Sequence, residues 1–176
     1  MNITATEQRT TAAPTRRTVD AHESSVEFAV KSLWGLATVH GRFDRFDGSY
    51  ESGPDGTTIE LTIDADSLDT GNATRDKHLR SAGFFHVAEH PQVRFTSTRV
   101  HTVREGILHV VGHLEAAGRS VVLEFPATVR HAGDVIDIEA TTTIDQQELG
   151  MSTGTLGMIR RPVTLHVMAS LKADAG

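Results

Sequence analysis

The residues with the clearest potential for chemistry are His86-x-x-Glu89-His90, whose order matches the H-x-x-E-H pattern of one class of zinc peptidases. In such enzymes the two histidines lie one turn apart on the same face of a helix, and the glutamate acts beside them. Pro91 follows directly and disfavours helical geometry at His90. An extended pattern begins just after it. We therefore expect a surface loop here, and neither a metalloprotease nor another metal site.

A second polar group lies a few residues earlier and comprises Arg75, Asp76, His78 and Arg80. His78 and Asp76 could form an acid–base pair in an enzyme that acts on a small amphiphile. A structural interpretation is also open, because a carboxylate is favoured in the first turn of a helix, and arginines pair with nearby carboxylates such as Asp66 or Asp69. The chain has neither a G-x-S-x-G nor a Walker A sequence.

The remaining histidines are scattered along a chain that holds ten of them. His109 and His113 are four residues apart in an alternating segment, so their side chains point to the same face of a strand. His101 could join His109 across a hairpin. We expect these histidines to be outward-facing strand residues, and we predict no metal centre among them.

Composition limits the class of protein. With 176 residues the chain is expected to form one domain and to bury about 70% of its unfolded surface. The net charge of −6 disfavours binding to nucleic acid and to anionic lipid surfaces. There is no cysteine, which excludes disulfides and thiolate chemistry.

Targeting signals are not evident in this sequence. No stretch approaches the 18 apolar residues of a membrane span, and Met1–Arg17 lacks an apolar segment. Arg16-Arg17 is not followed by a hydrophobic run, which disfavours a twin-arginine signal. We expect a cytoplasmic protein whose residues 1–16 are disordered.

The elements that must position these residues are mostly strands. Ile59, Leu61 and Ile63 alternate with polar residues, as in a half-buried strand. The last strand is expected to point Val163, Leu165, Val167, Ala169 and Leu171 inward. Further strands are predicted at Val26–Val30, Thr38–Phe46, Val93–Val100, Ile107–Leu114, Val121–Arg130 and Asp134–Ile144.

Turns and short helices complete this pattern. Asp47-Gly48 and Ala117-Gly118 are typical hairpin turns. A helix is predicted over Arg75–Ser81, capped by Asn72 or Thr74 and ended by Gly83, and a second near Gln146–Leu149. About eight strands with frequent turns predict an all-β sandwich or barrel, which periodicity alone does not distinguish.

The inward-facing apolar residues could form either a filled core or the wall of a cavity, and both interpretations remain open. The segment Met151–Ile159, rich in methionine and glycine, could form an adaptable lip. The residues that read as inward are Phe28, Val30, Leu61, Ile63, Phe84, Phe85, Phe95, Ile144, Leu165 and Val167.

One stretch resembles a known family. Thr70-Gly71-Asn72, Arg75-Asp76-x-His78-Leu79-Arg80-Ser81, Phe84-Phe85, Pro91, Phe95 and Ser97 are similar to the central motif of the YceI-like family. The resemblance extends to Val26-Glu27-Phe28, Gly41-Arg42-Phe43-x-x-Phe46-x-Gly48 and Leu149-Gly150-Met151, and covers roughly residues 18–172. Departures include His86, where the family usually has Asp, and Gln146-Gln147, where it commonly has Arg.

The resemblance implies a lipocalin-like, eight-stranded antiparallel β-barrel over residues 17–172, with one or two short helices and a tail at 173–176. It also implies a carrier, not an enzyme, whose lumen holds an isoprenoid quinone or similar long-chain amphiphile, and a possible homodimer. Arg75, Asp76, His78 and Arg80 would then form a rim for the head group. The expected lumen residues are Phe28, Val30, Trp34, Phe43, Leu61, Ile63, Phe84, Phe85, Phe95, Ile144, Met151, Leu156, Leu165 and Val167.

Overall fold

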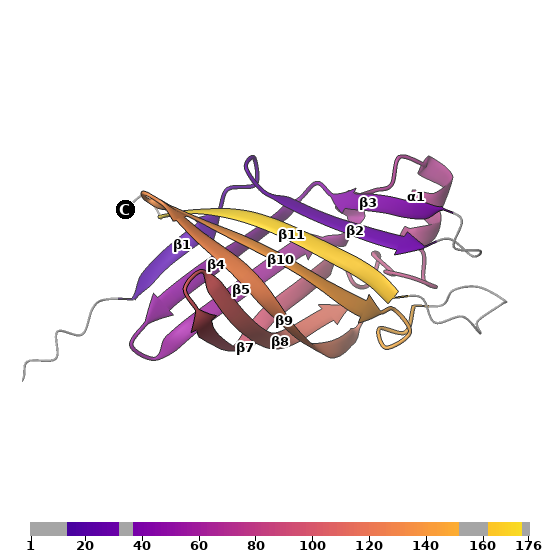
Figure 1. Ribbon diagram of the computed structural model, residues 1–176. Helices are drawn as coiled ribbons and strands as arrows, with labels where there is room; N and C mark the ends of the chain where they lie inside the picture. Colours follow the sequence, from indigo (N-terminus) through magenta and orange to yellow (C-terminus); the bar gives the residue numbers. More distant parts are fainter. Residues whose placement is uncertain (1–13, 32–36, 152–161, 174–176) are drawn as a thin grey trace, which may run out of the picture.

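The computed structural model describes residues 14–31, 37–151 and 162–173, and their strands form one continuous sheet (Figure 1). The part of the chain that it describes contains no helix with the length and apolar composition needed to cross a bilayer. The elements are β1 (Thr15–Val19), β2 (Ser25–Lys31), β3 (Thr38–Phe43), β4 (Phe46–Gly53), β5 (Gly56–Asp64), the 3-10 helix η1 (Ala65–Ser67), β6 (Leu68–Asp69), α1 (Ala73–Arg80), β7 (Gln92–Arg104), β8 (Ile107–Ala116), β9 (Arg119–Ala132), β10 (Val135–Asp145) and β11 (Pro162–Ala173).

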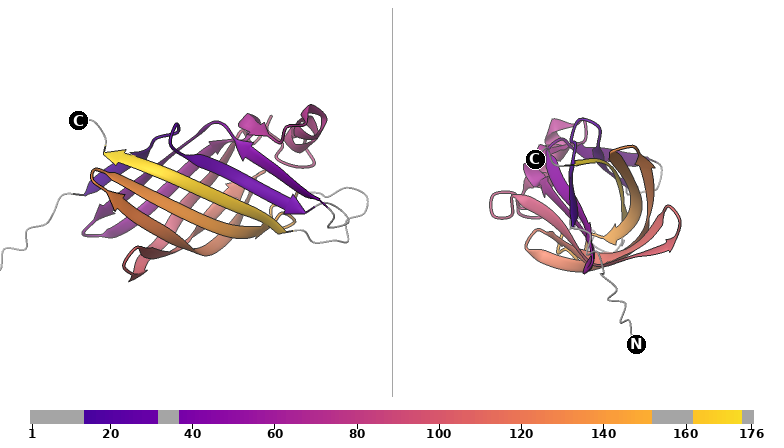
Figure 2. Two further views of the ribbon diagram at one scale, coloured as in Figure 1. Left: turned by 45° about the horizontal axis from the view of Figure 1, so that its top comes forward. Right: turned by 90° about the vertical axis from the view of Figure 1, so that its left-hand side faces the viewer.

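The sheet closes into an antiparallel barrel. Each of the strands β1, β4, β5, β7, β8, β9, β10 and β11 pairs with the next, and β1 returns to β11 to close the circle. The right-hand view of Figure 2 looks roughly along the barrel and shows the strands enclosing its interior. The predicted eight-stranded barrel is confirmed. Closure removes exposed sheet edges, and eight strands leave an interior wide enough for side chains or one small ligand.

Three short strands extend the barrel at the end where α1 lies. β11 pairs with β1 through Leu171 and Ala173 but with β2 through Val163–Met168, so β1 and β2 share one position in the barrel. A turn separates the two strands, and beside it the backbone N–H of Ser170 donates to the hydroxyl of Ser24. β3 pairs with β2 and also with β6, so these three strands extend the sheet past the eight strands that close the barrel.

Alternation along the strands decides which side chains enter the barrel. In β5 and β11 all the residues expected to point inward, including Ile59, Ile63, Val163 and Leu171, line the interior. The predicted hairpin at Ala117-Gly118 is also present, with φ angles of 50° and 74° at its two residues. Both residues of a type I′ turn need positive φ, and the twist of this turn suits a two-residue connection between antiparallel strands.

One predicted turn and one predicted helix are wrong. Asp47-Gly48 is not a hairpin turn, because both residues lie within β4, near its start, and pair with β5. A Cβ on Gly48 would lie 2.6 Å from the backbone oxygen of Glu60, so this glycine permits close strand packing. Gln146–Leu149 forms successive turns and not a helix. Its backbone hydrogen bonds join residues that are three or five apart, not four, and Gly150 after it has a φ of 71°.

The helix predicted over Arg75–Ser81 is present as α1, shifted by one or two residues. Asn72 caps it by accepting a hydrogen bond from the backbone N–H of Arg75, at 3.0 Å. The helix ends at Ser81 and not at Gly83, because the hydroxyl and backbone N–H of Ser81 both donate to the carbonyl of His78. This polar capping does the work that a glycine with positive φ does in many other helices.

An ion pair supports the turn beneath α1. Arg45 Nε lies 2.8 Å from Asp64 Oδ2, and the hydrogen bond between them holds the pKa of the Asp64 carboxyl below its usual value of 3.8. Asp64 also accepts from the backbone N–H of Asp66 and thereby caps the start of η1. Because the folded-state pKa is lowered, this stabilisation is present at neutral pH and is lost as the pH falls below about 3.8.

Candidate functional site

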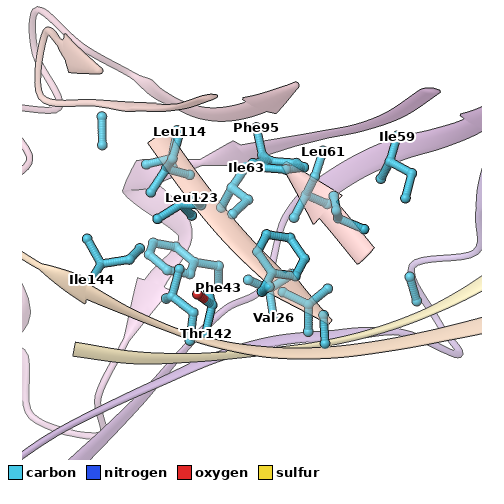
Figure 3. Close-up of a pocket in the computed structure, with 18 of the residues that line it drawn as sticks. Val26, Phe43, Ile59, Leu61, Ile63, Phe95, Leu114, Leu123, Thr142 and Ile144 are labelled. Atoms are coloured by element: carbon cyan, nitrogen blue, oxygen red, sulfur yellow. The ribbon is translucent and has the colours of Figure 1, made fainter. Parts of the chain in front are cut away.

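An apolar cavity runs through the barrel. The empty space between its lining atoms, with the open ends included, is about 1250 Å³. The centre of a water molecule could occupy only about 160 Å³ of this space. The cavity is therefore long and narrow. In Figure 3 side chains from opposite walls face each other across it: Leu61, Ile63 and Phe95 lie on one side, and Val26, Phe43 and Thr142 on the other.

The length of the cavity follows from β11. Every second residue of this strand from Val163 to Leu171 lines it. The eight steps from Val163 to Leu171 span roughly 26 Å of extended chain, and the tilt of barrel strands shortens this to roughly 20 Å along the axis. A narrow cavity of this length suits an extended chain better than a compact ligand.

Few polar atoms face this cavity, and none of its described lining residues is charged. Thr142 and Gln146 lie near the end of the barrel where β10 ends. Ser49 and Tyr50 lie on β4, which pairs with β1 toward the opposite end. Because an isolated charge in an apolar cavity carries a large desolvation cost, the described wall favours uncharged ligands.

Nine of the expected lumen residues line the cavity, which brings together positions from seven different segments of the chain. That they bind a ligand stays a prediction. They are Phe43, Leu61, Ile63, Phe85, Phe95, Ile144, Met151, Leu165 and Val167.

Three expected lumen residues do not line it. The ring of Phe28 lies over Gly41, where a Cβ would be 2.2 Å from it, and its centroid is 5.6 Å from that of the Phe43 ring. Phe84 packs instead against the ring of His78, with centroids 4.9 Å apart. Val30 lies near the end of β2, opposite Val163, and is not among the residues that line the cavity. Trp34 and Leu156 lie outside the described residues.

Sequence reasoning missed the small residues that leave the interior open. Ala127 and Ala140 are directly paired between β9 and β10, and both line the cavity. Ala140 also pairs with Val167 of β11. A methyl group at both positions leaves room that larger side chains would fill. The alternation in β9 and β10 could have placed these alanines inward, but their pairing depends on strand register.

The expected rim arginines are used within the protein. The Arg80 guanidinium donates to the carbonyls of Asp66 and Leu68 and forms an ion pair with Asp66 at 2.9 Å. Arg75 donates to the hydroxyl and carbonyl of Thr70. These bonds hold α1 against the segment before it. The geometry therefore favours the structural interpretation of both arginines.

Asp76 and His78 do not form an acid–base pair. Asp76 is buried, with 6% of its surface exposed, and accepts hydrogen bonds from the backbone N–H and hydroxyl of Thr70. His78 is exposed on another side of α1, where it packs on Phe84. Residues two apart in a helix do not face each other.

Asp76→Ala is expected to destabilise the protein by about 2 kcal/mol, because it leaves the amide and hydroxyl of Thr70 without their acceptor. Chemical denaturation of wild type and variant measures this difference. Lys77→Ala, at the neighbouring exposed position, is the control and should change stability by less than about 0.5 kcal/mol. Equal effects of the two substitutions would contradict a structural role for Asp76.

Comparison with known families gives a match over most of the chain. The model of the YceI-like domain matches residues 18–171. Protein YceI of Salmonella arizonae is 37% identical over 119 residues, which are 65% of this chain and 61% of that protein. A UPF0312 protein of Pectobacterium carotovorum is 36% identical over 118 residues, 65% and 60% of the two chains. The matched region thus spans about three fifths of these relatives.

Solved structures share the fold. BcnA of Burkholderia cenocepacia superposes with a TM-score of 0.79 at 20% identity, over 86% of this chain and 98% of that one. A protein of Saccharophagus degradans described as a polyisoprenoid binding domain gives 0.70 at 18% identity, over 89% and 98%. Likeness at these identities establishes the barrel architecture.

Proposed function

The chain belongs to the YceI-like family, and we propose that its barrel is a carrier that binds a long-chain isoprenoid lipid with an uncharged head group, such as an isoprenoid quinone. The observation that carries this proposal is the narrow apolar cavity that extends along β11 from Val163 to Leu171. The description of the Saccharophagus degradans protein as a polyisoprenoid binding domain also supports a lipid ligand.

The tail of such a lipid matches the wall of the cavity. Burial of a hydrocarbon chain gains about 0.8 kcal/mol per CH₂ group, from which the cost of ordering the chain is subtracted. Aromatic side chains such as Phe43 and Phe95 provide broad apolar surfaces along the interior. A tail of several isoprene units would contact both walls at once, whereas a short amphiphile would leave part of the cavity empty.

The uncharged head group is argued from the polar groups at the cavity. Thr142 and Gln146 are the described lining residues able to hydrogen-bond near the end of β10, and both are neutral. An amide can donate to a quinone carbonyl, but it cannot neutralise a diphosphate. Arg75 and Arg80 each use Nε and one terminal nitrogen in hydrogen bonds to the segment before α1, which holds both guanidinium groups there.

Gln146→Leu is expected to weaken binding of a long-chain quinone about three- to tenfold, because it removes one hydrogen-bond donor from a mostly apolar site. Gln147→Leu is the matched control, since Gln147 is adjacent but does not line the cavity, and it should leave the affinity unchanged. Titration of delipidated protein with a quinone measures both. Equal affinities for wild type and Gln146→Leu would remove Gln146 from the head-group site.

The function itself is tested by organic extraction of the purified protein followed by mass spectrometry. We expect an isoprenoid lipid at close to one molecule per chain. In competition, a neutral quinone should displace it more readily than a polyprenyl diphosphate with the same tail. A protein that carries no lipid and takes up none when offered both would contradict the proposal.

A carrier should also release its ligand chemically unchanged. Wild type and His78→Ala, incubated with the bound lipid, should both return it intact, because Asp76 is bonded to Thr70 and His78 packs on Phe84 and not on Asp76. Conversion of the lipid by wild type and not by His78→Ala would instead indicate an enzyme.

A further inference from the structure

The turn that follows α1 carries a cluster of potential metal ligands. One side-chain donor atom each of His86, Glu89 and His90 lie within 4.8 Å of one another. His86 Nδ1 is 3.7 Å from a carboxylate oxygen of Glu89, and the two imidazole rings have centroids 5.8 Å apart. Within residues 14–31, 37–151 and 162–173, no other group of three histidine, aspartate or glutamate side chains converges in this way.

The backbone, and not a helix, produces this convergence. Residues 82–89 form turns, as the proline at 91 suggests, so the zinc-peptidase geometry is absent. The backbone N–H groups of Glu89 and His90 both donate to the carbonyl of His86, which folds the chain back on itself. His86 has a φ of 49°, a conformation that is unusual for a residue other than glycine and that is often found at functional positions.

A neighbouring hairpin holds one of the ligands in place. The ring of His90 packs over Gly118 in the turn between β8 and β9, where a Cβ would lie 2.7 Å from His90 Nε2. His86 and His90 are half-buried, and Glu89 is exposed. Two ligands are therefore partly ordered by the fold, while the carboxylate is free to move toward an ion.

We propose that His86, Glu89 and His90 bind a divalent transition-metal ion, for which Zn²⁺ is the best match. Two imidazoles and one carboxylate form a common zinc ligand set, with a fourth position left for water. Imidazole donors also disfavour Mg²⁺ and Ca²⁺, which prefer oxygen ligands. Metal–ligand distances of about 2.0–2.2 Å place donor atoms about 3.3 Å apart in a tetrahedral site. The donor atoms here lie within 4.8 Å of one another, so modest rotation of the three side chains would bring them to that separation.

This site is separate from the lipid cavity. None of its three residues lines the cavity, although the preceding residue, Phe85, does. Phe85 also packs edge-on against Phe43, with centroids 5.8 Å apart. A metal ion would therefore stabilise a turn that supplies part of the cavity wall, without itself contacting the ligand.

The test is titration of the full chain, prepared without a histidine tag, with ZnCl₂ by calorimetry at pH 7.5. Wild type should bind one equivalent with micromolar affinity, and His86→Asn and Glu89→Gln should each weaken binding at least tenfold. His86→Asn suits the positive φ, because asparagine tolerates that conformation. His131→Ala, at an exposed histidine on β9, is the control and should bind as wild type does.

A second test measures metal binding by visible absorption instead of calorimetry. Co²⁺ in a site with these ligands should give visible absorption that Zn²⁺ abolishes. Thermal unfolding without metal checks that the variants fold. Binding by His86→Asn and Glu89→Gln at wild-type affinity would overturn the proposal, as would no binding by wild type below 100 μM.

Discussion

Ala140→Phe is expected to carry at least tenfold less bound lipid than wild type. Ala140 lies on β10 between Ala127 of β9 and Val167 of β11, and all three residues line the cavity. The whole cavity admits the centre of a water-sized sphere in only about 160 Å³, so a phenyl ring at this position would block a narrow passage. Extraction and mass spectrometry of protein purified in parallel measure the lipid content.

The matched control is Thr141→Phe, which adds a ring of the same size one residue later on the outer, exposed face of β10. Thr141→Phe should retain the wild-type lipid content. Both variants should unfold cooperatively, and Ala140→Phe should lose at most about 3 kcal/mol, because it fills existing space. If folded Ala140→Phe retains its full lipid content, the lipid does not lie in the cavity.

Gly112→Ala is expected to lower the free energy of unfolding by about 3 kcal/mol, because the added methyl group has no space. Its Cβ would lie 2.5 Å from the ring of Phe95 and 2.5 Å from the backbone oxygen of Thr96. The ring of Phe95 would have to shift, and the backbone at Thr96 is held by the pairing of β7 with β8. Chemical denaturation measures the loss.

Gly71→Ala is a useful comparison for this substitution. Gly71 has a φ of 72°, and a methyl group added to it would have no other atom within 4 Å, so alanine there carries a conformational cost without steric contact. We expect a loss of about 1 kcal/mol at Gly71. If Gly112→Ala is no more destabilising than Gly71→Ala, the ring of Phe95 does not lie over Gly112 and the cavity wall is arranged differently.

Most of the barrel could be predicted from the sequence because strand alternation is a local property. A period of two correctly predicts which residues point inward, both in β5, such as Ile59, and in β11, such as Leu171. The same period describes a sandwich, so closure of the sheet was predicted only through resemblance to the YceI-like family. The break of β3 and β4 at Asp44 and Arg45 was missed, because Asp47-Gly48 carried a stronger turn signal.

The cavity and the metal-ligand cluster depend on contacts that local patterns do not contain. Whether the interior is filled depends on which side chains meet across it, and the pairing of Ala127 with Ala140 follows from strand register. Phe28 was expected at the lumen, but Gly41 on the adjacent strand gives its ring another place. His86 and His90 were judged by a helical rule, whereas a turn with positive φ brings them together.

The central claim is that this barrel is hollow along its length and holds one extended apolar chain. A crystal structure of the protein purified with its lipid, or loaded with a long-chain quinone, tests it most directly. We predict continuous tubular density between Leu61 and Leu165, with the head group near Gln146. An interior in which side chains from opposite walls meet, with no density between them, would contradict the account.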